Sequence, residues 1–328
     1  MSKDLKFIDL FAGIGGIRMG FQDYFGECLF SSEWDKYSQI TYEANFGHKP
    51  NGDITQINEN DIPNFDILLG GFPCQPFSNA GLKQGFEDTR GTLFFDIARI
   101  IKHHKPKIIF LENVKGLKGH NGGNTFKTIE NTLTDMGYNL YSTILNAKNF
   151  GVPQNRERIY IVGFLENIDF SFPVPPKNDI KLGDILETKV EDKYTLSDRL
   201  WAGHQKRKQE HLAKGNGFGY SIFNQNSSYT STISARYYKD GSEILIEQKD
   251  KNPRKLTPRE AARLQGFPEN FIIPVSDNQA YKQFGNSVAV PVIKAIAEQI
   301  KIALDLPLKK PEIDLFNVYY ENRKIANQ

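Results

Sequence analysis

Short apolar runs alternate with helical stretches over roughly the first 170 residues of the chain. The run at residues 5–11 leads into a glycine-rich turn at 12–16, and a helical stretch follows over 17–25. Similar apolar runs stand at 65–69 and 107–111. Strands that are separated by helices pair in parallel, because the helix carries the chain back across the sheet. The alternation therefore predicts an open α/β sheet, in which ligands bind at the carboxyl ends of the strands.

The alternation stops at a proline-rich segment, residues 173–176, which is typical of a linker. Residues 177–253 contain turn clusters in its place, which indicates an irregular segment. Order returns at Thr257, which is followed by Pro258 and predicts a capped helix through Gln265. A helix-forming pattern that resumes after a long irregular stretch favours more than one domain.

The length of 328 residues also exceeds that of a usual single domain. We expect a first α/β domain over residues 1–176 and a second, smaller domain, mostly β or irregular, with a hinge over 177–280. A turn at 285–288 then opens a long amphipathic helix that runs to about residue 304. This returning segment, 281–328, is expected to complete the first domain.

The composition is that of an ordinary globular protein, with 39% hydrophobic and 24% charged residues. No apolar run approaches the roughly 18 residues that a membrane span needs, and the N-terminus lacks the apolar core of a secretory signal. We therefore expect a cytoplasmic protein. The two cysteines fit a reducing compartment and are too few for a disulfide framework or a four-cysteine zinc site, so no metal is expected. Cys28 is interpreted as a core residue.

Basic residues are concentrated in one part of the chain. Residues 199–263 hold 13 Lys and Arg against 6 Asp and Glu, whereas the remainder holds 28 against 33. A basic surface beside an acidic body is typical of a nucleic-acid-binding module. A solvated charged face without a partner is the alternative.

A candidate nucleotide site follows from the glycine turn and the acidic residues after it. Glycines at 13, 15 and 16 let the main chain approach a ligand, and the helix that follows offers unpaired N–H groups. Glu33 stands 20 positions after Gly13, a spacing that suits a carboxylate on ribose hydroxyls. Trp34 is placed to lie on a flat ring, or else to pack in the core. Asp53, where a third strand is expected to end, adds a carboxylate.

Cys74 stands between Pro73 and Pro76, shortly after the apolar run at 65–69. A stiff proline-flanked loop at the carboxyl end of a strand is a suitable place for a nucleophile. The alternative for a lone cysteine is a small core hydrophobe. Glu112 follows the run at 107–111 and is expected at the same edge of the sheet.

Two arginines, Arg156 and Arg158, precede another apolar run at 159–164. Strand alternation would place both on one face, where paired guanidinium groups bind carboxylate or phosphate. Two solvated charges on an edge strand are the alternative.

These motifs together resemble those of the bacterial DNA (cytosine-5) methyltransferases of restriction–modification systems. They stand in the family's order and span nearly the whole chain: FIDLFAGIGG at 7–16, GFPCQ at 71–75, ENV at 112–114, QNRER at 154–158, REAARLQGFP at 259–268 and QFGNSV at 283–288. The resemblance implies a Rossmann-like S-adenosylmethionine domain and a variable target-recognition domain that begins near the proline linker. It also implies double-stranded DNA as substrate and a restriction endonuclease as genetic partner; we expect a monomer.

The resemblance implies catalytic roles for Cys74, Glu112, Arg156 and Arg158. Cytosine carbon 5 is a poor nucleophile, so a thiolate at position 74 would first attack carbon 6 of a base flipped out of the duplex. Glu112 would protonate or hydrogen-bond N3. Arg158 would stabilise O2, with Arg156 holding either its loop or Glu112.

The remaining site residues are expected at the cofactor and at DNA. Those expected at S-adenosylmethionine are Phe11, Gly13, Ile14, Gly15, Glu33, Trp34, Asp53, Ile54, Pro73, Leu93, Asn286 and Ser287. Those expected at DNA are Gln75, Ser78, Arg90, Lys206, Arg207, Lys208, Arg236, Tyr237 and Lys239. The loop at 75–90 is expected to close over the flipped base; Ala80 stands where some relatives carry a serine, which leaves open the side chain that fills the gap.

Two other functions fit part of the pattern. One branch of the family methylates tRNA, although the basic module at 177–253 favours duplex DNA. A non-catalytic DNA-binding regulator with a decayed methylase fold is the second alternative, against which the presence of Cys74, Glu112 and Arg158 argues. Residues 216–220 and 234–241 resemble recognition domains of Dcm-type enzymes, whose target class is CC(A/T)GG.

Overall fold

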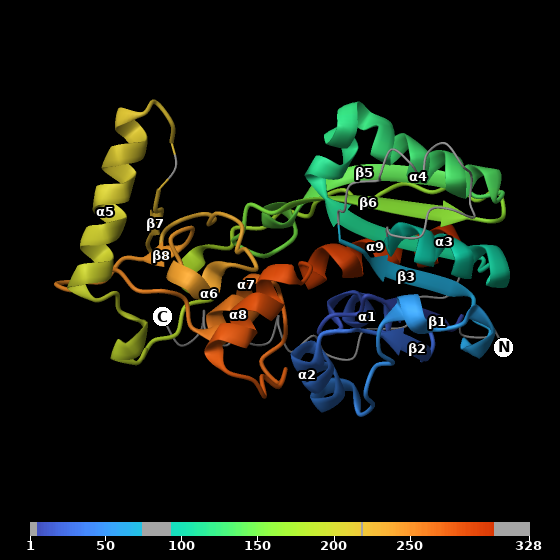
Figure 1. Ribbon diagram of the computed structural model, residues 1–328, viewed down its shortest axis with the longest axis horizontal. Coiled ribbons are helices and arrows are strands. Elements are labelled where there is room, and N and C mark those ends of the chain that lie inside the picture. Colours follow the sequence, from blue (N-terminus) through green and yellow to red (C-terminus); the bar gives the residue numbers. More distant parts are fainter. Residues whose placement is uncertain (1–4, 74–92, 218, 305–328) are drawn as a thin grey trace. The chain divides into compact units, whose positions relative to one another are not determined.

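The computed structural model describes residues 5–73, 93–217 and 219–304, and the chain divides into two compact units (Figure 1). Within the described residues, the first unit contains the chain up to Asn146, Glu157–Val174, and Val292 onward. The second unit contains Ala147–Arg156 and Pro175–Pro291. Each unit is therefore assembled from segments that are separated in the sequence.

The first unit is built on a six-stranded mixed sheet in the order β2-β1-β3-β4-β6-β5. Neighbours among β1 to β4 pair in parallel, and β6 runs antiparallel to both β4 and β5. This arrangement confirms the predicted α/β class. The strands are β1 Phe7–Leu10, β2 Cys28–Ser32, β3 Ile67–Gly71, β4 Ile108–Val114, β5 Asn139–Asn146 and β6 Glu157–Phe164.

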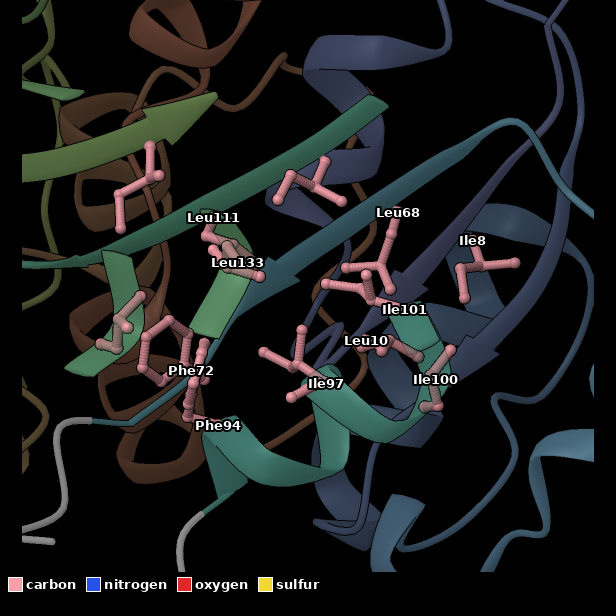
Figure 2. Close-up of a cluster of buried hydrophobic side chains, with 14 of the residues drawn as sticks. Ile8, Leu10, Leu68, Phe72, Phe94, Ile97, Ile100, Ile101, Leu111 and Leu133 are labelled. Carbon is pink, nitrogen blue, oxygen red and sulfur yellow. The ribbon is translucent and has the colours of Figure 1, made fainter. Parts of the chain in front are cut away.

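Helices α3 and α4 cover one face of this sheet, where the main hydrophobic core lies. Figure 2 shows Ile97 and Ile101 of α3 beside Leu68 of β3 and Leu111 of β4. These side chains are completely buried. The helices of the first unit are α1 Gly16–Phe21, α2 Lys36–Phe46, α3 Leu93–His104, α4 Asn124–Asp135 and α9 Val290–Ala303, the last beginning in the second unit.

The C-terminal helix α9 packs against α1. A Cβ atom on Gly20 would lie 2.4 Å from Cγ2 of Ile293, so a side chain at position 20 would displace the helix. Lys294 pairs with Asp23 at 2.8 Å, and Lys301 donates to the carbonyl of Tyr24 at 2.6 Å. Within the described residues, the chain from Val292 therefore packs as part of the first unit.

One predicted strand of the first unit is wrong. A third strand was expected to end near Asp53, but the structure has only an isolated bridge between Asn51 and Ser32. Asp53 instead caps a short 3-10 helix, because its carboxylate accepts from the N–H of Thr55. The 3-10 helices are Ile54–Gln56, Glu59–Asp61, Lys115–Gly123, Ala147–Asn149, Leu182–Asp184 and Asp192–Tyr194.

The second unit is more helical than the sequence indicated. Its elements are α5 Asp198–Ala213, β7 Ile222–Phe223, α6 Tyr237–Asp240, β8 Leu245–Ile246, α7 Pro258–Leu264 and α8 Asp277–Asn286. The 16-residue helix α5 (yellow in Figure 1) replaces a predicted irregular segment. Only His204 of this helix is buried, so no apolar stripe reveals it. Ser197 caps its start by accepting from the N–H of Leu200.

The structure confirms one predicted helix start in the second unit and corrects another. Thr257 caps α7 in a reciprocal capping box with Glu260, and Pro258 is its first residue. By contrast, residues 285 and 286 end helix α8 rather than forming a turn, and the long helix begins at Val290. None of the helices in the described part of the chain has both the length and the hydropathy of a membrane span.

Candidate active site

The carboxyl ends of β3 and β4 lie side by side. The two strands pair in parallel with Gly71 in register with Glu112. The side-chain amide of Asn113 donates to the carbonyl of Phe72 at 2.8 Å, which fixes the chain just after β3. Pro73 is exposed there. The next residue is the predicted nucleophile Cys74, and it lies outside the described residues, as do Gln75, Ser78 and Arg90.

Glu112 forms an ion pair with Arg158. The guanidinium Nε lies 3.1 Å from Oε1, and the two side chains are only 15% and 11% exposed. Strands β4 and β6 bring them together, because Val114 pairs with Arg158 across the antiparallel ladder. A second guanidinium nitrogen of Arg158 donates to the carbonyl of Glu157 at 2.8 Å. Charge-assisted contact in a low-dielectric setting gives the carboxylate a fixed orientation at the end of the strand.

Arg156 lies in the second unit and has different partners. Its guanidinium donates to the carbonyls of Ile233 and Gly285, each at 3.3 Å, and to the carbonyl of Ser287. Because β6 begins only at Glu157, the prediction that Arg156 and Arg158 share one strand face is wrong. Of the two roles left open for Arg156, these contacts favour holding main-chain segments.

The glycine turn after β1 adopts the conformation that its sequence requires. Gly13 and Gly15 have φ of +55° and +83°, in the left-handed region that favours glycine. A Cβ on Gly15 would lie 2.1 Å from the ring of Phe46, whereas one on Gly13 would meet no heavy atom within 4 Å. Phe11 also has a positive φ, of 55°. At Gly13, the turn therefore leaves space for a ligand to approach the main chain.

Glu33 and Trp34 follow β2 beside this turn. The Glu33 carboxylate is 8% exposed and accepts from the N–H of Gly13 at 2.8 Å and of Asp35 at 2.7 Å. Burial raises the pKa of Glu33, and the two N–H donors oppose that shift. The Trp34 side chain is 72% exposed, which excludes the core-packing alternative. A buried acceptor next to an open indole face suits a ribose joined to a flat base.

The other residues predicted at the cofactor fall into two groups. Asp53 and Asn286 are exposed, and Ser287 and Leu93 are half-buried, so these side chains are accessible. Ile14 and Ile54 are 2% and 3% exposed, and their side chains pack in the interior. Contacts of these two isoleucines with a cofactor stay a prediction, and they would have to be made through the main chain.

Asp9 is a residue of this region that the sequence reasoning missed. It is fully buried in β1, and neither carboxylate oxygen has a hydrogen-bond partner within the described residues. Burial raises its pKa from 3.8 to about 7; the charge of Arg18 opposes the shift and that of Glu33 adds to it. An acidic residue inside an otherwise apolar strand run was the available signal.

The predicted DNA-contacting residues of helix α5 differ in how free they are. The Lys206 side chain is 79% exposed and lies 3.9 Å from the carboxylate of Glu210, one helical turn further on. Arg207 pairs with Asp240 at 3.0 Å. Lys208 donates to the carbonyl of Tyr220 and lies 4.3 Å from the centre of its ring. Consecutive helical residues point in different directions, so these three do not form one patch.

The predicted DNA-contacting residues around helix α6 include both exposed and buried side chains. Arg236 and Lys239 are exposed. Tyr237 is 0% exposed; its hydroxyl donates to the carbonyl of Ile244 and accepts from the N–H of Leu256. The prediction that Tyr237 contacts DNA is therefore wrong, and the neighbouring Tyr238, 36% exposed, is the accessible aromatic.

A sheet whose first four strands pair in parallel, with a glycine turn after β1 and a carboxylate after β2, is typical of nucleotide-binding α/β proteins. A family model of the C-5 cytosine-specific DNA methylases matches residues 5–302. The chain belongs to this family and is a DNA (cytosine-5) methyltransferase. The match to the DNA methylase model favours DNA over the tRNA alternative.

Relatives of known type align over nearly the whole chain. The type II methyltransferase M.SsoII of Shigella sonnei is 66% identical, with 92% of this chain and 81% of that protein covered. The type II methyltransferase M.DsaV of Dactylococcopsis salina is 56% identical, with 98% and 94% covered. Among solved structures, the methyltransferase EhMeth of Entamoeba histolytica has a TM-score of 0.76 at 22% identity, over 92% of this chain and 99% of that one. This structural likeness confirms the fold.

Proposed function

We propose that the chain is the modification enzyme of a type II restriction–modification system and methylates carbon 5 of a cytosine within a specific DNA sequence. The observation that carries the mechanism is the Glu112–Arg158 pair at the end of β4, in register with Gly71, three positions before Cys74. The names of the relatives, type II methyltransferases 66% and 56% identical to the chain, support the biological setting.

The proposed mechanism begins with a bond from the Cys74 sulfur to carbon 6 of a flipped-out cytosine. The carbon 5–carbon 6 double bond opens, and Glu112 delivers or shares a proton at N3, where negative charge would otherwise develop. Arg158 holds Glu112 in place and offers its guanidinium to O2. After carbon 5 has gained a methyl group, loss of its proton breaks the bond from carbon 6 to sulfur and releases the Cys74 thiolate.

We propose S-adenosylmethionine as the methyl donor, and the residues near the glycine turn fit it. When bound, it supplies an electrophilic methyl group. Glu33 would accept from the ribose hydroxyls, and Trp34 would stack on the adenine. The main chain at Gly13 would approach the amino-acid portion, since a Cβ there would enter open space. Asn286 and Ser287 of the second unit remain predicted contacts.

We also propose that the second unit recognises the DNA target sequence. Arg236 and Lys239 are its exposed candidates near α6, and Lys206 its exposed cation on α5. The resemblance of this region to Dcm-type recognition domains leads to a CC(A/T)GG-like target. The cytoplasmic location, the monomeric state and the cognate restriction endonuclease also stay predictions.

The covalent step is tested with duplex DNA that carries 5-fluorocytosine, because fluorine at carbon 5 blocks the final elimination. We expect the purified enzyme to form a denaturation-resistant complex in the presence of S-adenosylmethionine, and Cys74→Ser to form none. Cys28→Ala is the matched control, since Cys28 is the buried thiol of β2. Absence of a trapped complex with the wild-type enzyme would contradict the mechanism, and bisulfite sequencing of methylated DNA would identify the target.

A further inference from the structure

Helix α6 is only four residues long, Tyr237–Asp240, so its geometry depends on the contacts of its side chains. Tyr237 is completely buried. Its hydroxyl donates to the carbonyl of Ile244 at 2.7 Å and accepts from the N–H of Leu256 at 2.8 Å. Its ring packs edge-on against that of Tyr281 in helix α8, with 5.1 Å between the ring centres (Figure 1). These contacts fix the direction in which the other residues of α6 point.

Two acidic side chains hold the chain on either side of α6. Asp240, at the end of the helix, forms an ion pair with Arg207 of α5 at 3.0 Å. Glu243 accepts from the hydroxyl of Ser234 at 2.7 Å, and the same hydroxyl oxygen accepts from the N–H of Arg236 at 3.2 Å. Both carboxylates are therefore engaged within the protein, and the short helix is held at its two ends.

The three exposed side chains of this segment are not engaged in this way. Among the described residues, the side chains of Arg236 and Lys239 have no hydrogen bond or ion pair, and Tyr238 has no hydrogen bond or ring contact. With about 3.6 residues per helical turn, Arg236 and Tyr238 lie on the two flanks of the buried Tyr237, and Lys239 points away from it. A fixed element that presents two unpaired cations beside an exposed aromatic ring has the composition of a binding surface for an anionic partner.

The charges of these side chains separate their roles at DNA. Free arginine and lysine side chains attract phosphates whatever the base sequence. The ring of Tyr238 is uncharged and 36% exposed. Its hydroxyl can both donate to and accept from the polar edge of a base, and its ring can pack against that edge. Of the three side chains, Tyr238 therefore has the least to gain from phosphate and the most from a base.

We propose that Tyr238 is a specificity-determining residue, whose side chain contacts a base of the target sequence while Tyr237 holds helix α6 in place. This inference rests on the proposed function, because it takes the second unit as the part that recognises DNA. The contact costs little conformational entropy, since tyrosine has few side-chain torsions and α6 is already fixed. Discrimination at one part of the target depends on Tyr238, whereas affinity for random DNA does not.

The test compares dissociation constants for the target duplex, identified by bisulfite sequencing, for its single-base variants and for random DNA. Tyr238→Ala should lower the discrimination against variants at one or two positions by about 5-fold or more. The salt dependence of binding to random DNA should stay unchanged, because no charge is removed. Tyr229→Ala is the matched control: Tyr229 is a 44% exposed tyrosine of the same unit, and the Lys148 ammonium already lies 4.5 Å from its ring centre. This control should keep the wild-type discrimination.

Two results would overturn the inference. One is unchanged discrimination by Tyr238→Ala at every position, and the other is an equal loss on all duplexes, random DNA included. A wild-type enzyme that prefers no sequence would instead contradict the proposed function, and the inference with it.

Urea unfolding checks that Tyr238→Ala is folded. If it is not, photocrosslinking of the wild-type enzyme decides, with 5-iodinated pyrimidines placed in turn at each pyrimidine of the target other than the methylated cytosine. The peptide that contains Tyr238 should be crosslinked from at least one position. Absence of that adduct from every position would overturn the inference.

Discussion

The two units of the molecule position their functional residues by different means. In the first unit, the strand ladders set the register. The pairing of β3 with β4 fixes the position of Glu112, and the pairing of β4 with β6 fixes that of Arg158. In the second unit, buried polar side chains hold the main chain of irregular segments, as Arg156 does. A ladder survives most side-chain changes, whereas a side-chain contact depends on one residue.

The second unit repeats this device away from the Arg156 contacts. Arg254 binds Glu260 with two hydrogen bonds of 2.7 and 2.8 Å, and the two side chains are 6% and 0% exposed. Glu260 also accepts from the N–H of Glu187, 73 residues away in the sequence. One carboxylate therefore connects three segments. In the first unit, a change at a catalytic side chain can therefore spare the fold. In the second unit, the buried polar side chains themselves hold the fold.

Glu112→Gln should produce the largest effect in the molecule, a loss of catalysis. Loss of the proton donor at N3 is expected to lower kcat by about 10²- to 10⁴-fold, while the β4 ladder keeps the fold. Methyl incorporation and urea unfolding would be measured together. Glu157→Gln is the control, because its ion pair with Lys115 is exposed. A kcat within about tenfold of wild type would remove Glu112 from the mechanism.

Glu260→Gln should lower the free energy of unfolding by about 3 to 5 kcal/mol, since it leaves the Arg254 charge buried without a counter-charge. Urea unfolding followed by circular dichroism measures this loss. Asp192→Asn, which breaks the exposed pair with Lys251, should leave the unfolding midpoint unchanged. Equal effects of the two substitutions would show that buried polar contacts do not dominate the second unit.

Asp9→Asn tests whether a buried charge also matters in the first unit. The pKa of Asp9 rises from 3.8 to about 7 on folding, so the folded state binds more protons than the unfolded state between these values. The contribution of Asp9 to the free energy of unfolding is therefore highest at low pH. It falls by roughly 1 kcal/mol per pH unit as pH rises from 3.8 to about 7.

The comparison of wild type with Asp9→Asn at pH 5, 6 and 7.5 isolates this contribution, because the groups that face Asp9 remain in both proteins. These groups include Arg18, Glu33, Cys28 and Tyr42. The variant should gain stability relative to wild type as pH rises. A difference that is independent of pH would show that Asp9 stays ionised in the folded protein.

Lys206→Ala should have the smallest effect, on DNA affinity only. Removal of one phosphate contact lowers the salt dependence of binding by about one unit and weakens all duplexes alike. Binding to cognate and random DNA across a salt series measures both quantities. Arg207→Ala should change less, because Asp240 already holds that guanidinium. A loss confined to the cognate duplex would assign Lys206 to base reading instead.

The sequence predicted local features well and tertiary ones poorly. The helix that begins after Thr257 was identified because its capping box lies within four residues. Helix α5 was missed because it buries only His204. Tyr237 and Tyr238 were indistinguishable, since an irregular segment has no period that separates inward from outward residues. The sequence also did not show that Arg156 lies outside the strand that contains Arg158, because this depends on where β6 begins.

The packing of α9 on α1 bears on how the protein is made. Ile293 fills the space left by Gly20, and Lys301 reaches the carbonyl of Tyr24, 277 residues earlier in the chain. A ribosome delivers Lys301 277 residues after Tyr24, so the nascent first unit waits for that long stretch before this surface is covered. A chain that stops before Val292 lacks that cover, and we expect it to be degraded rather than to persist as a folded fragment.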